Sequence, residues 1–126
     1  MNNQRTVLLV EDEDNLRELL KMVLEEQGIK VLAAMDGEEA LKIFSAHQDE
    51  IVLVLSDLGL PRLGGWEAFL KMKKINPELK GILASGFSSA DVRTEIIKSG
   101  AMEFISKPYD ADKIVATIRR VLDERK

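Results

Sequence analysis

The 126-residue sequence contains no cysteine, which excludes a disulfide framework and any metal site with thiolate ligands. Its single histidine, His47, has no histidine, cysteine or acidic partner at ligand spacing, and this argues against a metal or phosphohistidine role. The amino terminus carries one positive charge, on Arg5, and leads into an apolar run too short for a signal peptide or a membrane span. We therefore expect a cytoplasmic protein without a membrane segment.

An excess of positive charge is also missing. The net charge of -4 argues against direct nucleic-acid binding, which normally requires a basic face. Basic residues cluster at 71–74 and 119–120, but they alternate with apolar helix positions, as is typical of a solvated helix surface. No linker, repeat or low-complexity segment interrupts the chain. We expect one domain over residues 1–126, with a core large enough to fold without cross-links.

Short apolar runs alternate with amphipathic stretches along the whole chain. The runs that we expect to be strands are Thr6–Val10, Lys30–Ala34, Ile51–Ser56, Gly81–Ser85 and Ala101–Ile105. Each parallel crossover needs a helix, so the alternation predicts an α/β fold with helices on both faces of a parallel sheet. We expect a flavodoxin-like, doubly wound sheet of five strands in the order 2-1-3-4-5, with five helices. That order leaves a crevice between the first and third strands.

Local signals mark the ends of the first two helices. The first carries the apolar stripe of an amphipathic helix, at Leu16, Leu19, Leu20, Val23 and Leu24. Gly28 follows it in the manner of a left-handed cap. Asp36, with Glu39 three residues later, resembles a capping box that begins the second helix.

The most apolar predicted strand, Ile51–Ser56, runs directly into Asp57, and Gly59 and Pro61 then break any regular element. A carboxylate in this position lies at the carboxyl edge of the sheet, where open α/β folds bind their ligands. Asp57 is therefore the first candidate for chemistry. The alternative is that Asp57 only hydrogen-bonds the backbone of a turn, as aspartate often does.

Other predicted strands bring polar residues to the same edge. Glu11 and Asp12 follow the first strand, Ser85 ends the fourth, and Lys107 follows the fifth. Taken singly, each could have an ordinary role: the acidic pair favours a helix start, the hydroxyl satisfies a turn, and the lysine is a surface charge. Their presence at four strand ends of one sheet favours a common site.

Carboxylates gathered at one place repel, and a divalent cation relieves that repulsion. An all-oxygen site with few protein ligands suits Mg²⁺ or Mn²⁺, and the ligand candidates are Glu11, Asp12, Asp57 and the Gly59 carbonyl. A carboxylate can also act as a nucleophile and form an aspartyl phosphate. Asp57 is placed for that role, and phosphoryl transfer needs mainly positioning and charge stabilisation.

In order and spacing, these motifs resemble the receiver domain of two-component response regulators. The resemblance rests on Glu11-Asp12, on the DLGLP segment from Asp57 to Pro61, on Ser85-Gly86 and on Lys107-Pro108. It covers nearly the whole chain. The segment Ser85–Phe87 also resembles receivers found within hybrid histidine kinases, so the chain could be a stand-alone protein or part of a larger one.

The resemblance implies that Asp57 accepts a phosphoryl group from the phosphohistidine of a histidine kinase or phosphotransfer domain. Glu11 and Asp12 would help to bind Mg²⁺, and Ser85 and Lys107 would contact the phosphoryl group. The chain would then be a signalling domain in a phosphorelay and not an enzyme, apart from its own phosphorylation and dephosphorylation.

The resemblance also implies a switch. Phe104 occupies the position whose aromatic side chain reorients on activation, and Pro61, Gly86 and Pro108 would shape the site. The surface formed by the fourth helix, fifth strand and fifth helix would carry the output, possible homodimer contacts included. The downstream protein partner is not indicated.

Three other functions have sequence signatures that can be compared. A receiver that docks or dimerises without phosphorylation would lack part of the acidic pair, Asp57 or Lys107, and this chain has all of them. An aspartate-nucleophile phosphatase would carry a second aspartate where Gly59 stands. A flavin-binding module would need a Ser, Thr and Gly-rich phosphate loop in place of residues 11–14, which read EDED.

Overall fold

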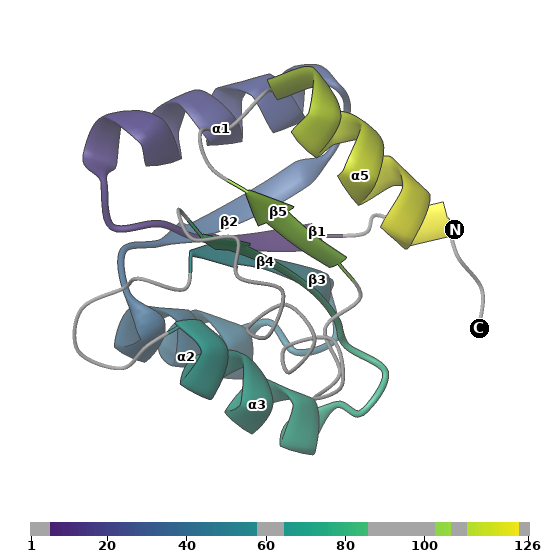
Figure 1. The fold of residues 1–126 in the computed structure, drawn as a ribbon. Coiled ribbons are helices and arrows are strands. Elements are labelled where there is room, and N and C mark those ends of the chain that lie inside the picture. Colours follow the sequence, from purple (N-terminus) through teal and green to yellow (C-terminus); the bar gives the residue numbers. More distant parts are fainter. Residues whose placement is uncertain (1–5, 58–64, 86–102, 107–110, 124–126) are drawn as a thin grey trace.

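The computed structural model describes residues 6–57, 65–85, 103–106 and 111–123. Its elements alternate along the chain (Figure 1): β1 (Thr6–Val10), α1 (Asp14–Glu26), β2 (Lys30–Ala34), α2 (Gly37–Ala46), β3 (Ile51–Asp57), α3 (Gly65–Ile75), β4 (Lys80–Ser85), β5 (Glu103–Ser106) and α5 (Ala111–Asp123). The strands pair in parallel in the order β2-β1-β3-β4-β5. The predicted α/β class with a parallel sheet is confirmed. The helix expected between the fourth and fifth strands lies outside the described residues.

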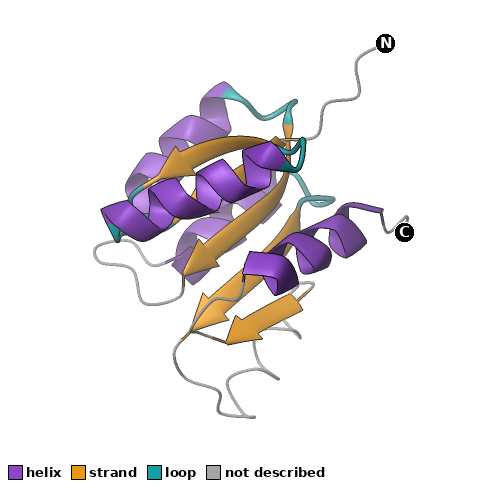
Figure 2. Ribbon diagram, turned by 90° about the horizontal axis from the view of Figure 1, so that it is seen from above, coloured by secondary structure: helices purple, strands orange, loops and turns teal. Residues whose placement is uncertain are grey.

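Two helical layers enclose the sheet. Helices α1 and α5 cover one face and α2 and α3 cover the other, as the two perpendicular views show (Figures 1 and 2). The side chains of successive β1 residues lie on opposite faces of the sheet, and those on both faces are buried, as expected for a strand covered on both sides. Val7 and Leu9 belong to the core under α1 and α5, whereas Leu8 and Val10 belong to the core under α2 and α3.

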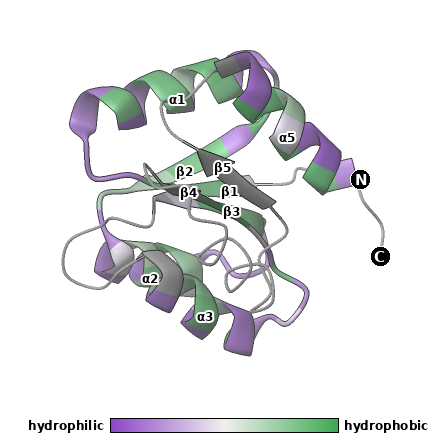
Figure 3. Cartoon of the chain, in the orientation of Figure 1, coloured by the Kyte–Doolittle hydropathy of each residue, from purple (hydrophilic) through white to green (hydrophobic). Residues whose placement is uncertain are grey.

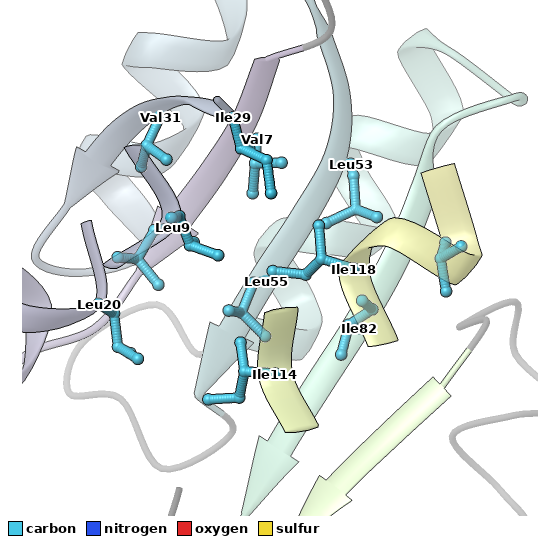
Figure 4. Packing of buried hydrophobic residues seen from close by; sticks show 12 residues of the cluster. Val7, Leu9, Leu20, Ile29, Val31, Leu53, Leu55, Ile82, Ile114 and Ile118 are labelled. Carbon is cyan, nitrogen blue, oxygen red and sulfur yellow. The ribbon is translucent and has the colours of Figure 1, made fainter. Parts of the chain in front are cut away.

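The core under α1 and α5 is built from aliphatic side chains. Ile114 and Ile118 of α5 pack with Leu55 of β3 and Ile82 of β4, and all four are essentially fully buried (Figure 4). Burying a side chain of this size stabilises the fold by about 1.5–3 kcal/mol. This packing positions α5 across the sheet.

Part of the predicted apolar stripe of α1 is not in the core. Hydrophobic and hydrophilic residues alternate along α1 (Figure 3), and Leu20 and Leu24 are buried. Leu19, however, is 50% exposed, because the inward face of the helix is narrower than the stripe. No helix in the described ranges has the length and apolar character needed to cross a bilayer.

Both predicted caps are confirmed. Gly28 has a φ of 83°, and the amide of Ile29 donates to the Leu24 carbonyl at 3.1 Å, which ends α1 in a left-handed turn. At the start of α2, Asp36 Oδ1 accepts from the Glu39 amide at 2.8 Å. The Glu39 carboxylate in turn accepts from the amide of Met35 at 2.7 Å, one residue earlier than in the usual capping box.

Candidate functional site

The strand register brings the backbones of Glu11, Asp57 and Ser85 to one edge of the sheet. Val10 pairs with Ser56, so Glu11 and Asp57 follow at adjacent strand ends. Asp57 in turn pairs with Ala84, next to Ser85. Parallel strands end at the same edge. The sequence prediction expected Asp57 just beyond its strand, whereas it is the last residue of β3.

The structure places Asp57, Ser85 and Phe104 by their backbones. Phe104 lies within β5, paired with Leu83 of β4, and Ser106 ends that strand immediately before residue 107. The remaining predicted site residues lie outside the described residues, and they are Gly59, Pro61, Gly86, Lys107 and Pro108.

Glu11 is held more firmly than Asp12, the other predicted metal ligand whose side chain the structure describes. It is only 1% exposed. Its amide donates to the Ala34 carbonyl of β2 at 3.0 Å, which extends the β1–β2 pairing by one residue. Its carboxylate Oε2 accepts from the amide of Glu13 at 3.1 Å. A buried carboxylate held in this way is fixed in direction before any ligand arrives.

Asp12 has the opposite environment. Its side chain is exposed, and within the part of the chain that the structure describes it makes no hydrogen bond or ion pair. The neighbouring carboxylates of Glu11 and Asp12 therefore differ: one is buried and anchored, and the other is open to solvent. An exposed carboxylate can bind a cation without first losing an ion pair.

The donor set at this edge fits a hard divalent cation. Glu11 and Asp12 supply carboxylate oxygens, and the backbone of Asp57 lies at the adjacent strand end. Mg²⁺ prefers oxygen ligands and keeps several waters, so it needs only one or two protein carboxylates. Among the side chains that the structure describes there is no group of three or more acidic, histidine or cysteine residues, and the expected group needs the side chain of Asp57 in addition.

An arginine at this edge was not predicted from the sequence. Arg17 Nη1 donates to the backbone carbonyl of Glu11 at 2.9 Å, and Nη2 donates to Asp14 Oδ1 at 2.7 Å. The ion pair could have been predicted from the sequence, because Asp14 and Arg17 are three residues apart on a helix. The contact with Glu11 has no sequence signal, because it depends on how the segment before α1 turns.

The prediction that His47 has no acidic partner is wrong. His47 Nδ1 lies 3.3 Å from Glu50 Oε2. The Glu50 carboxylate also accepts from Lys30 Nζ at 3.2 Å. This group lies where β2 and β3 begin, at the edge of the sheet away from Asp57.

The fold and the acidic strand ends define a doubly wound α/β protein with a polar site at the carboxyl edge of its sheet. A sequence model of the response regulator receiver domain matches residues 7–119. The chain therefore belongs to the response regulator receiver domain family.

Relatives of two sizes are similar to this chain. It is 32% identical over its whole length to the C4-dicarboxylate transport transcriptional regulatory protein DctD of Rhizobium meliloti, but it spans only 27% of that protein. It is 30% identical to the chemotaxis protein CheY of Thermotoga maritima, with 93% of this chain and 97% of CheY covered. The non-phosphorylated receiver domain of HemR from Leptospira biflexa has a TM-score of 0.89 at 29% identity, and 97% of each chain is covered.

Proposed function

We propose that this chain is a phosphoacceptor: Asp57 takes a phosphoryl group from the phosphohistidine of a histidine kinase or phosphotransfer domain. The observation that carries the proposal is the position of Asp57 at the end of β3, beside the strand end that holds Glu11 and Asp12. In the transfer, the phosphorus–nitrogen bond to histidine breaks and a phosphorus–oxygen bond to the Asp57 carboxylate forms. The freed histidine nitrogen is then available to a proton from solvent.

Glu11, Asp12, Asp57 and the carbonyl of Gly59 are the proposed ligands of Mg²⁺ or Mn²⁺. When bound, the cation would neutralise charge on the phosphoryl oxygens during transfer. The burial of Glu11 and the exposure of Asp12 support this ligand set. The Glu11 carboxylate is held in one direction before the cation binds, and the Asp12 carboxylate can turn toward the cation.

Ser85 and Lys107 are proposed to contact the phosphoryl group on its other side. The Ser85 hydroxyl and the Lys107 ammonium can both donate hydrogen bonds to its oxygens. A change there would pass to Phe104 in β5, because β4 and β5 are paired. The phosphoryl group would shift the equilibrium between two conformations of this region only by as much as it interacts more favourably with one conformation than with the other.

The receiver domain is proposed to span residues 1–126, with a fifth helix between β4 and β5. The surface of that helix, β5 and α5 would carry the output and any homodimer contact. Pro61, Gly86 and Pro108 would hold the loops of the site in shape. We infer that the chain acts in a phosphorelay by protein contact, without binding nucleic acid itself.

Phosphorylation with a small donor tests the proposal. The wild-type chain, Asp57→Asn and the control Asp49→Asn are incubated with acetyl phosphate and Mg²⁺, and their intact masses are measured. Wild type and Asp49→Asn should gain one phosphoryl group that hydroxylamine removes, and Asp57→Asn should gain none. Equal labelling of Asp57→Asn would refute the assignment of Asp57.

A further inference from the structure

Arg17 connects the first turn of α1 to the acidic segment before it. It is the fourth residue of α1, and its guanidinium turns back toward the helix start. One nitrogen donates to the Glu11 carbonyl at 2.9 Å and another to Asp14 Oδ1 at 2.7 Å. The Arg17 side chain is 18% exposed and that of Asp14 is 78% exposed, so the bond to the Glu11 carbonyl is partly buried whereas the bond to Asp14 is open to water.

With this arginine, the segment on either side of Asp12 is fixed at several points. The Glu11 amide bonds to Ala34, the Glu11 carboxylate accepts from the Glu13 amide, and the Glu11 carbonyl accepts from Arg17. The Glu13 carbonyl accepts from the Arg17 amide at 2.9 Å. Asp12 thus lies between two anchored residues while its own side chain is exposed.

We propose that Arg17 is a positioning residue: it holds the backbone of Glu11, so that the Glu11 carboxylate is preset for Mg²⁺ and the exposed Asp12 carboxylate extends from a fixed backbone. This inference rests on the metal site of the proposed function. The planar guanidinium suits the task, because its nitrogens bond two acceptors in a fixed relative direction. Replacing a residue that orients a metal ligand typically weakens metal affinity about 10- to 100-fold.

A purely electrostatic role for Arg17 makes the opposite prediction. A cation close to the site repels Mg²⁺, so its removal would tighten metal binding. That repulsion is weakened here because Asp14 pairs with the guanidinium and because the segment borders water, where charge interactions are small. The loss of anchoring should therefore outweigh the loss of repulsion, and the sign of the change in affinity separates the two roles.

Two substitutions make the test independent of charge. Arg17→Gln removes both the positive charge and the two guanidinium donors that bond Glu11 and Asp14. Arg17→Lys keeps the charge, but a single ammonium group cannot reproduce the directed pair of bonds to Glu11 and Asp14. If Arg17 positions the segment, both variants bind Mg²⁺ more weakly; if only its charge matters, Lys matches wild type and Gln binds more tightly.

Arg119 provides a matched control at the other end of α1. Its Nη2 donates to the backbone carbonyl and to the side-chain oxygen of Gln27, both at 2.9 Å. Arg119→Gln therefore removes an arginine that also bonds a carbonyl flanking α1, but far along the helix from Glu11. It reports any effect of loosening α1 in general.

The experiment is calorimetric titration of the full chain with Mg²⁺, with thermal melting to verify folding. Arg17→Gln and Arg17→Lys should raise the Kd for Mg²⁺ on the order of 10-fold, and Arg119→Gln should leave it unchanged. In the metal-free proteins, the NMR amide signals of Asp12 and Glu13 should shift in both Arg17 variants and not in Arg119→Gln. The lysine variant, being the milder change, decides the matter if Arg17→Gln does not fold.

The failures of the two proposals are distinguishable. Asp12→Asn tests the metal site itself and should abolish most Mg²⁺ binding. A wild-type chain without Mg²⁺ affinity, or an Asp12→Asn variant that binds as wild type does, would overturn the metal site and the role of Arg17 with it. Normal binding by wild type, loss in Asp12→Asn, and equal or tighter binding in the Arg17 variants would overturn the role of Arg17 alone.

Discussion

The ring of Phe69 in α3 lies directly against the backbone of Gly81 in β4. Both residues are buried, and a Cβ atom at position 81 would meet the Cζ and Cε1 atoms of the ring well inside van der Waals distance. The absence of a side chain on β4 therefore allows α3 to approach the sheet at this point. β4 also pairs with β3 and carries Ser85 at its end.

Gly81→Ala should lower the free energy of unfolding by about 1–3 kcal/mol, because extra volume in a packed core forces neighbours out of position. Phe69→Leu makes room at the cost of buried area. The double variant should lose less than the two single losses added together, since the clash is shared. Urea denaturation of the four proteins measures the coupling, and strict additivity would show that the ring and the glycine do not constrain each other.

Gly28 is required by its backbone and not by its surroundings. A Cβ atom at this position would have no neighbour within 4 Å, but φ is 83°, where residues with a Cβ are strained. Gly28→Ala should cost about 1–2 kcal/mol in unfolding free energy. Gly28→Asn should cost less, since asparagine tolerates this conformation. Equal losses in the two variants would contradict a purely conformational cause.

Features that depend on a few neighbouring residues were predictable from the sequence. The cap at Gly28 and the cap at Asp36 arise from local backbone geometry, and both are confirmed. Periodicity located α1, but it could not show that Leu19 stays half exposed. That outcome depends on how far the sheet and α5 cover the helix, which is a long-range property.

The candidate site was predictable to the extent that strand ends could be recognised. Glu11 and Asp57 each follow an apolar run, and the parallel register places them at adjacent strand ends. The anchoring by Arg17 was not predictable, because it needs the path of the segment before α1. The contact of His47 with Glu50 could have been predicted, since a spacing of three residues is within reach of a hydrogen bond at a helix end.

Glu50 should contribute to stability in a pH-dependent way. Its hydrogen bond with His47, and then the hydrogen bond and the positive charge of Lys30, hold the pKa of the Glu50 carboxyl below its usual value of 4.5. The carboxylate form is thus favoured in the folded protein, so the stabilisation is present above that usual value. It is lost as the pH falls through the lowered pKa.

Replacing Glu50 checks this sign. Glu50→Gln should lower the free energy of unfolding near neutral pH and should make that free energy fall less steeply as the pH is lowered. Asp49→Asn, which removes an exposed carboxylate next to Glu50, should keep the wild-type dependence of stability on pH. Midpoints of urea unfolding, measured at several pH values in the acid range, give the dependence of stability on pH for each protein. A Glu50→Gln profile parallel to wild type would show that the group with His47 and Lys30 does not form in solution.

Magnesium should stabilise the folded chain, because the proposed ligands come together only in the fold. At a Mg²⁺ concentration ten times its Kd, the free energy of unfolding should rise by about 1.4 kcal/mol relative to a sample with chelator. Asp12→Asn should lose most of that rise. In chelator, however, Asp12→Asn should be more stable than wild type if the carboxylates of the proposed site repel one another, because the substitution neutralises one of them. Thermal melting of both proteins with and without Mg²⁺ separates these effects. If Asp12→Asn is the more stable protein in chelator and wild type the more stable with Mg²⁺, a shared cation site is supported. If Mg²⁺ changes the stability of both proteins equally, Asp12 does not take part in the site.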